Sequence, residues 1–267
     1  MISFKSILHG TDLLVDPWLG LTSKGKPPLF RHKSAALQLS KRKNIPSSHG
    51  FLTSAYSHID HNWHRALKNG KYSKSKENWR FEKRTDMSPK NSSEEVSLER
   101  AIVRAADDHW ANQVPTSSGL VGRSSDKTRN IDLVHHDGDQ NFTFIELKVE
   151  SNNPLFAAIE ILLNGLLFIW SRNNASTLYD DGLLPPVLTA KSVALCVLAP
   201  IEFYDCDRLD LTNLCQSINQ GLESLEYRSE IPCSFEFSAL RDKFNPKDSP
   251  QRLLQSAEHR TPIWRAA

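Results

Sequence analysis

The chain has 267 residues, of which 39% are hydrophobic and 24% are charged, and its formal net charge is +2. This composition excludes a chain that is disordered throughout and fits one domain with extensions or two small domains. Residues 1–91 contain 17 Lys and Arg against 6 Asp and Glu, whereas the remainder contains 16 against 25. This asymmetry favours contact with a polyanion, and the alternative is a solvated basic extension.

Cysteine usage and hydropathy indicate the compartment. The four cysteines form no Cys-x-x-Cys pair, so neither a zinc knuckle nor a disulfide framework is expected. The first residues lack the pattern of a secretory signal. The most apolar stretch, 154–170, is interrupted by Glu160 and Asn164 and is shorter than a bilayer span. We therefore expect a cytoplasmic protein without a membrane span, in which this stretch is a buried helix.

The N-terminal third is rich in Lys, Ser, Asn and Pro and has few apolar residues. We predict a basic extension over 1–91 that is loosely ordered or small and helical, with one helix at about 55–68. Three histidines at three-residue spacing on that helix could hold a metal, although surface histidines in a polar segment are commoner. They are His58, His61 and His64.

The composition changes at Ser92, where a capping box formed with Glu95 predicts the start of a helix that continues to about Asn112. Glu99 lies on the same stripe as the apolar residues of this helix. It is either a functional carboxylate or a carboxylate at the rim of the apolar face.

Two β-favouring runs, 130–135 and 141–149, flank Asp137-Gly138, which is a strong hairpin signal. A strand at 113–121 precedes this hairpin. A helix over 154–170 follows it, capped by Asn152 or Asn153 and with Pro154 at its first position.

Downstream, the pattern predicts a buried strand at 191–199, an amphipathic helix at 211–225 and a short strand around Phe235 and Phe237. The residues after Asn245 read as a loosely structured tail. The order of elements over 92–245 predicts an α/β domain with a mixed sheet and helices on its faces.

Three residues of the hairpin carry the predicted chemistry. Glu146 and Lys148 are two apart on a strand and so share a face. A register in which paired residue numbers sum to 278 places Asp132 opposite Glu146. Two close carboxylates repel unless a cation compensates them, and oxygen ligands suit magnesium or manganese. The cation and Lys148 could then activate water against a phosphodiester. The alternative is an Asp132–Lys148 ion pair on an exposed sheet face.

These residues resemble the PD-(D/E)xK nuclease superfamily, which includes many restriction and DNA-repair endonucleases. The match is Asp132, thirteen residues, and then Glu146-Leu147-Lys148, within the element order of 92–200. The family's proline before the aspartate is absent, since Ile131 stands there. The resemblance implies a restriction-endonuclease-like sheet and adds Glu99 to the site as an accessory metal ligand beside Asp132 and Glu146. It also implies a polar residue from the following helix, either Glu160 or Asn164.

We therefore expect a magnesium-dependent nuclease, most simply a DNA endonuclease, and RNA stays open as the substrate. A homodimer is the expected assembly only because two-fold dimers are the commonest kind. The alternative is a catalytically silent nucleic-acid-binding or regulatory module on the same fold. Aromatic residues of the extension, namely Trp63, Tyr72 and Trp79, could stack on bases. The expected phosphate contacts are Lys41, Arg42, Lys43, Lys68, Lys71, Lys74 and Lys76.

Overall fold

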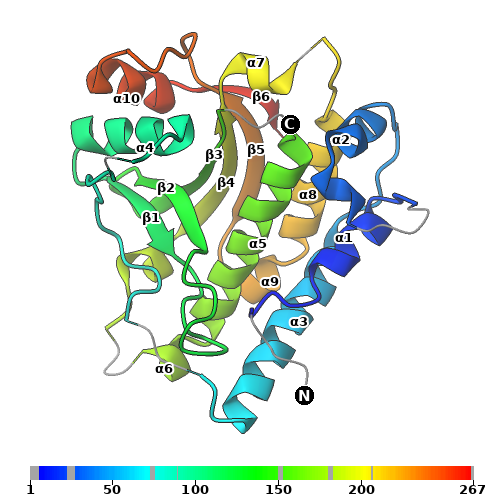
Figure 1. The fold of residues 1–267 in the computed structure, drawn as a ribbon. Helices are drawn as coiled ribbons and strands as arrows, with labels where there is room; N and C mark the ends of the chain where they lie inside the picture. Colours follow the sequence, from blue (N-terminus) through cyan, green and yellow to red (C-terminus); the bar gives the residue numbers. More distant parts are fainter. Residues whose placement is uncertain are drawn as a thin grey trace.

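A six-stranded mixed sheet with helices on both faces forms the centre of the molecule (Figure 1). The structure is a computed structural model that describes residues 6–22, 28–72, 76–88, 90–149, 153–179, 183–205 and 207–265. The strands lie in chain order across the sheet: β1 (Trp110–Pro115), β2 (Asn130–His136), β3 (Asn141–Leu147), β4 (Ser192–Ala199), β5 (Cys233–Ala239) and β6 (Thr261–Arg265). The predicted α/β class with a mixed sheet is confirmed.

The pairing follows the predicted order of strands. The β1–β2 and β2–β3 pairs are antiparallel, β3–β4 and β4–β5 are parallel, and β5–β6 is antiparallel. In the hairpin, Leu133 pairs with Ile145 and His136 with Phe142, so the paired numbers sum to 278 as predicted. The predicted register is therefore confirmed over these pairs.

The helices of the described residues cover the two faces of the sheet. Helices α1 to α5 are α1 (Asp12–Trp18), α2 (Lys33–Ser40), α3 (His49–Lys68), α4 (Glu94–Ala105) and α5 (Pro154–Asn173). Helices α6 to α10 are α6 (Ala175–Leu178), α7 (Ile201–Tyr204), α8 (Thr212–Glu223), α9 (Glu226–Ser229) and α10 (Pro250–Glu258). Two short 3-10 helices are η1 (Leu29–Arg31) and η2 (Pro186–Thr189).

Helix α5 is the buried helix that the sequence predicted. It begins at Pro154, and the side chain of Asn153 accepts a hydrogen bond from the backbone N–H of Phe156. It is long and apolar enough to cross a membrane, but 89% of its most apolar 18-residue stretch is buried inside the protein. Its Gly165 lies so close to β4 that an added Cβ would come within 2.7 Å of Leu195. The helix is apolar all round because the sheet covers one side and the N-terminal helices cover the other (Figure 1).

The described residues of the N-terminal segment match the helical alternative, but their helices pack on the rest of the protein and do not form a separate extension. Helix α3 contacts both α5 and α8, and its Phe51, Ile59 and Trp63 belong to the main hydrophobic core. The helix predicted at 55–68 is α3, which begins earlier than predicted, at His49. Trp63 and Trp79 are 1% and 0% exposed, so neither can stack on a base, and that prediction was wrong for both. Tyr72 is exposed.

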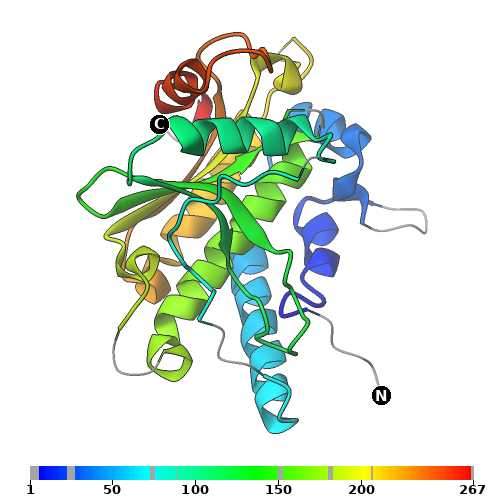
Figure 2. The same ribbon diagram turned by 60° about the vertical axis from the view of Figure 1, so that its left-hand side comes forward.

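The opposite face of the sheet is covered by α4, which runs across the strands in Figure 2, and by α10. The C-terminal residues after Asn245 were predicted to be loosely structured, but they form α10 and β6, and α10 packs on α4. The predicted helix at 92–112 ends at Ala105, because Ala106 has an extended backbone. Its cap is Ser93 in place of Ser92. The strand predicted at 113–121 was misplaced, because β1 covers Trp110–Pro115 and residues 116–121 form bends and turns.

His135 of β2 should make the folded protein less stable as the pH falls below neutrality. Its ring lies against Trp110 with centroids 4.5 Å apart, and burial, followed by the charge of Arg260, lowers its pKa to about 4. The folded state then binds fewer protons than the unfolded state, so stability is lost as the pH falls from about 6.5 towards 4. Urea unfolding at pH 7 and pH 4.5 should show a smaller loss in His135→Gln than in the wild type. An identical loss in both proteins would contradict this.

Candidate functional site

The β2–β3 hairpin opens at Asp132, and this opening positions the candidate site. Strand pairing ends with Leu133 and Ile145. Beyond that pair, the carboxylate of Asp132 accepts a hydrogen bond of 2.9 Å from the backbone N–H of Leu147. The side chain thus takes the place of a backbone acceptor, and its carboxylate lies between the ends of the two strands.

Glu146 and Lys148 lie close to this carboxylate at the end of β3. The ammonium of Lys148 is 2.6 Å from Glu146 Oε1 and 3.3 Å from Glu160 Oε2. Glu160 comes from α5, so this ammonium connects the end of the strand with the helix that follows it. Side chains of Glu146 and Lys148 are only 7% and 13% exposed, which excludes the exposed sheet-face ion pair considered from the sequence.

The two hairpin carboxylates are costly in their ionised form. Burial raises the pKa of Asp132 to about 7, against the opposing effects of Lys148 and the N–H of Leu147. Burial and then the charge of Asp132 raise the pKa of Glu146 well above its usual value. Burial alone would lower the pKa of Lys148, but Glu146, Glu160 and Asp132 raise it. Lys148 is therefore an ammonium at neutral pH. The carboxyl groups beside it are costly to ionise because they are buried, even with this positive charge next to them.

Glu99 lies near these groups but is already engaged. It is 2% exposed, so it is not a carboxylate at the rim of an apolar face. Its oxygens accept hydrogen bonds from Arg100 at 2.5 Å, Asn112 at 2.5 Å and Gln113 at 2.7 Å. Burial raises its pKa, while Arg100 and the two amides lower it. Its charge also raises the pKa of Asp132, although burial is the main cause of that rise.

Sequence reasoning missed Glu95 and Gln113. Glu95 was assigned to a capping box, yet its Oε1 accepts from the backbone N–H of Val149, and its charge also raises the pKa of Asp132. The signal was present, since Glu95 lies four residues before Glu99 and so on the same helix face. Gln113 has a φ of +49°, which breaks the alternation of β1 where the residue turns towards Glu99. That backbone state has no clear sequence signature.

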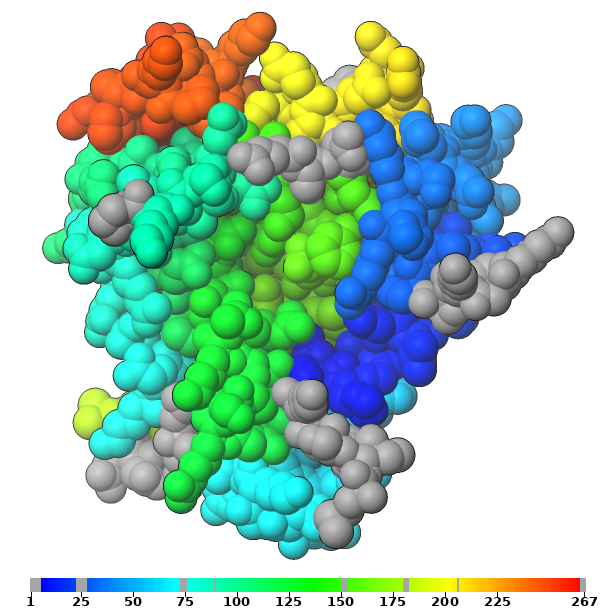
Figure 3. Space-filling view, viewed as in Figure 1, coloured from blue at the N-terminus to red at the C-terminus, as the bar shows by residue number. Residues whose placement is uncertain are grey.

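Of the two α5 residues implied by the family resemblance, only Glu160 contacts the site lysine. Asn164 is buried and instead accepts a hydrogen bond from the hydroxyl of Thr116 at 3.2 Å. In the space-filling view, the surface is hollowed between α4 and α2, and α5 lies at the floor of the hollow (Figure 3). One third of the Glu160 side chain is exposed, so water and solutes reach α5 beside Lys148.

The basic residues predicted to bind nucleic acid fall into two groups. Lys41 and Lys43 are exposed just after α2, and Lys68, Lys71 and Lys76 are exposed at the far end of α3, which spans about 30 Å. Arg42 instead donates to the carbonyls of Leu19 and Gly20 and so ties down the end of α1. Lys74 lies outside the described residues. The two groups lie towards opposite ends of the molecule (Figure 1), so they do not form one patch.

The described residues do not include a complete set of metal ligands. Across the parts of the chain that the structure describes, no group of three or more His, Cys, Asp and Glu side chains is placed to hold a metal ion. This applies to His58, His61 and His64 and to the three carboxylates predicted to bind the metal, which are Asp132, Glu146 and Glu99. Asp132 and Glu146 still fit magnesium, which takes one or two carboxylates and completes its shell with water and phosphate oxygens. Burial raises the pKa of both carboxyl groups, so a bound cation would stabilise their ionised forms.

Comparisons with known proteins found no match, whether against family models, curated proteins or solved structures. The proposed function therefore rests on the residues of this site and their contacts.

Proposed function

We propose that this protein is a magnesium-dependent nuclease that hydrolyses phosphodiester bonds in DNA, as an endonuclease. The observation that carries the proposal is the meeting of Asp132, Glu146 and Lys148 at the open end of the hairpin, with both carboxylates raised in pKa. Perturbed carboxylates beside a lysine in an accessible hollow are typical of a catalytic site. Manganese has the same ligand preference and could replace magnesium.

The fold proposal goes with the function. We assign the sheet to the restriction-endonuclease-like type, supported by the order of its elements: α4, the three antiparallel strands β1 to β3, α5, and β4 parallel to β3. In this arrangement α5 connects two parallel strands, and its N-terminal half faces the end of β3. Glu146 and Glu160 meet at Lys148 because the end of β3 and the N-terminal half of α5 lie at the same end of the sheet.

The residues of the chain have distinct roles in this mechanism. Asp132 and Glu146 would hold magnesium, which when bound polarises a phosphoryl oxygen and acidifies water. The N–H of Leu147 fixes one oxygen of Asp132 and so orients the carboxylate. Glu146 and Glu160 hold the ammonium of Lys148 between them, which keeps it charged. From there Lys148 can orient the attacking water and stabilise negative charge on the phosphorane-like transition state.

The test is plasmid cleavage by matched variants. Wild-type protein with magnesium should nick or linearise the plasmid, and EDTA should stop the reaction. Asp132→Asn should reduce the rate at least 100-fold, because an amide is a much weaker magnesium ligand than a carboxylate. Asp139→Asn, the same substitution in the exposed hairpin turn, should cleave like the wild type. Equal cleavage by both variants would remove Asp132 from the mechanism.

A catalytically silent module on the same fold is the second candidate. The observation in its favour is that Lys148 already neutralises part of the carboxylate charge, and no three-ligand group lies within the described residues. Calorimetric titration with magnesium and manganese separates the two functions. Binding by the wild type that is lost in Asp132→Asn supports the nuclease, whereas no binding by either protein supports the silent module.

A further inference from the structure

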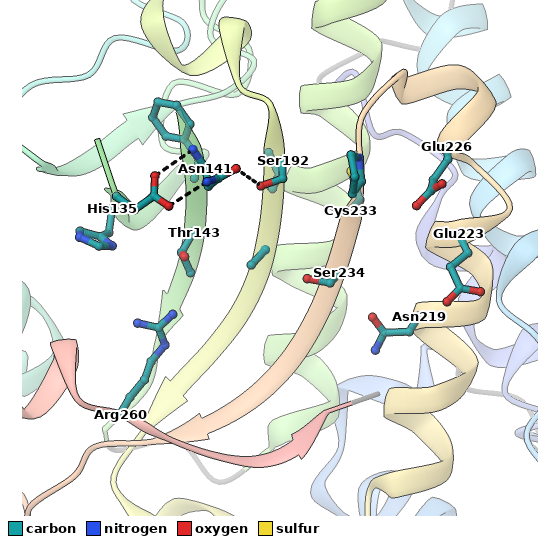
Figure 4. Close-up of a pocket in the computed structure, with 15 residues that line it drawn as sticks. His135, Asn141, Thr143, Ser192, Asn219, Glu223, Glu226, Cys233, Ser234 and Arg260 are labelled. Carbon is teal, nitrogen blue, oxygen red and sulfur yellow. Dashed lines mark hydrogen bonds between the residues drawn. The ribbon is translucent and has the colours of Figure 1, made fainter. Parts of the chain in front are cut away.

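A second polar region lies on the opposite face of the sheet from Lys148. There α4 and α10 cover only part of the sheet, packing on Leu133, Leu147 and Leu198. Towards the other ends of the strands the residues on this face are small or polar, as at Thr143, Ala194 and Ser234, and they line a pocket. The result is a groove of about 500 Å³, a size that suits a small ligand (Figure 4).

Arg260 is the cationic centre of this groove. It lies between α10 and β6, only 18% exposed, and its Nε donates to Glu236 Oε1 at 3.3 Å. The same oxygen of Glu236 accepts from the hydroxyl of Ser238, so the carboxylate that holds the arginine is itself held. This contact uses only Nε, and Figure 4 shows the terminal nitrogens directed across the groove towards Thr143.

Hydrogen-bonding groups surround the guanidinium. Thr143 of β3 and Ser234 of β5 place hydroxyls on the floor, with Ala194 of β4 between them. His135 lines the side beside Thr143 and, with its lowered pKa, is a neutral ring at pH 7. Arg260 lines the groove together with Thr143 of β3 and Ala194 of β4, so its guanidinium lies over the middle strands (Figure 4).

The geometry points to a binding site for a small molecule that carries one anionic oxygen group, a carboxylate or a phosphate. Two terminal guanidinium nitrogens held in a fixed plane match two oxygens of such a group. The hydroxyls of Thr143 and Ser234 can complete its hydrogen bonds.

The rim of the groove limits the size and charge of the ligand. Asp137 lines it at the hairpin turn, and Glu223 and Glu226 line it at the other end. Three carboxylates along this rim would repel the extended phosphate backbone of a nucleic acid more than a single small oxyanion held at Arg260. The site is thus separate from the proposed nuclease chemistry in both location and charge.

Thermal unfolding with simple oxyanions tests this site. The probes are inorganic phosphate and acetate, each added to the metal-free protein in EDTA, with sodium chloride at equal ionic strength as the reference. A ligand that binds only the folded state raises the unfolding midpoint in a saturable way. We expect this rise with at least one probe, and the stronger probe identifies the oxyanion as phosphate or carboxylate. No saturable rise with either probe overturns the proposal.

Variants place the binding at Arg260. Arg260→Gln should remove the rise, whereas Arg208→Gln, at an exposed arginine paired with Asp205, should keep it. Because Arg260→Gln also leaves Glu236 without its partner, a second variant combines Thr143→Val with Ser234→Ala and preserves the arginine pair. It should weaken binding at least tenfold. Wild-type affinity in both groove variants overturns the proposal.

Discussion

Lys148→Ala should lower the rate of magnesium-dependent plasmid cleavage at least 100-fold. The ammonium is held by Glu146 at 2.6 Å and Glu160 at 3.3 Å beside Asp132, so it is the one cation in contact with this group of described carboxylates. Removing a charged group that stabilises developing negative charge typically costs a hundredfold or more in rate. The measurement is the rate of supercoil loss at saturating magnesium.

Loss of the charge also affects the folded protein, and the controls must separate this from catalysis. Without Lys148, Glu146 and Glu160 lose their counter-charge, so we expect the variant to be less stable at pH 8 than at pH 5, where carboxyl groups take up protons. Circular dichroism at both values shows whether the variant is folded. Lys191→Ala, at an exposed lysine before β4, should leave cleavage unchanged. Cleavage by folded Lys148→Ala at the wild-type rate would remove the lysine from the mechanism.

The meeting of Asp132, Glu146 and Lys148 could be predicted because local signals determine it. The Asp137-Gly138 turn and the alternating residues on each side fix the hairpin register, and the register alone places these side chains at one end of the strands. The opening of the hairpin at Asp132 could not be predicted in the same way. It depends on the carboxylate of Asp132, which accepts a hydrogen bond from the N–H of Leu147 in place of a backbone carbonyl of the neighbouring strand.

The end of the helix at Ala105 was missed for a similar reason. No glycine or proline follows it, and apolar residues continue at helical spacing to Trp110. A residue distant in sequence provides a hydrogen bond at the end of this helix, since the ammonium of Lys83 donates to the carbonyl of Ala106 at 3.2 Å. A contact between segments more than twenty residues apart leaves no local pattern to read.

The N-terminal segment shows the largest difference between prediction and structure. Its apolar residues are too sparse to form a core of their own, and that observation favoured a loose extension. Helix α5, however, is apolar all round and needs cover on the side away from the sheet, and α3 supplies it through Ile59 and Trp63. The segment is stable because it completes another core, which composition counted by segment cannot show.

Gly221→Ala tests that packing and should destabilise the protein by about 2–3 kcal/mol. Gly221 lies in α8 where α3 begins, and an added Cβ would lie 1.8 Å from Ser48 Oγ and 2.9 Å from its backbone carbon. Ser48 is buried and donates from its hydroxyl to the carbonyls of Ser217 and Ile218. The methyl group must displace Ser48 and break these bonds. Urea unfolding at pH 7 measures the loss.

Gly50→Ala is the matched control, because it makes the same change within a helix of the same protein. Nothing lies within 4 Å of a Cβ at Gly50, so the substitution should stabilise the protein by about 0.5–1 kcal/mol through helix propensity alone. The difference between the two variants therefore isolates the contact between α3 and α8. If the N-terminal segment were loosely attached in solution, Gly221→Ala would gain the same helix propensity and the two variants would be equally stable. Opposite signs for the two changes are expected only when α3 is part of the core.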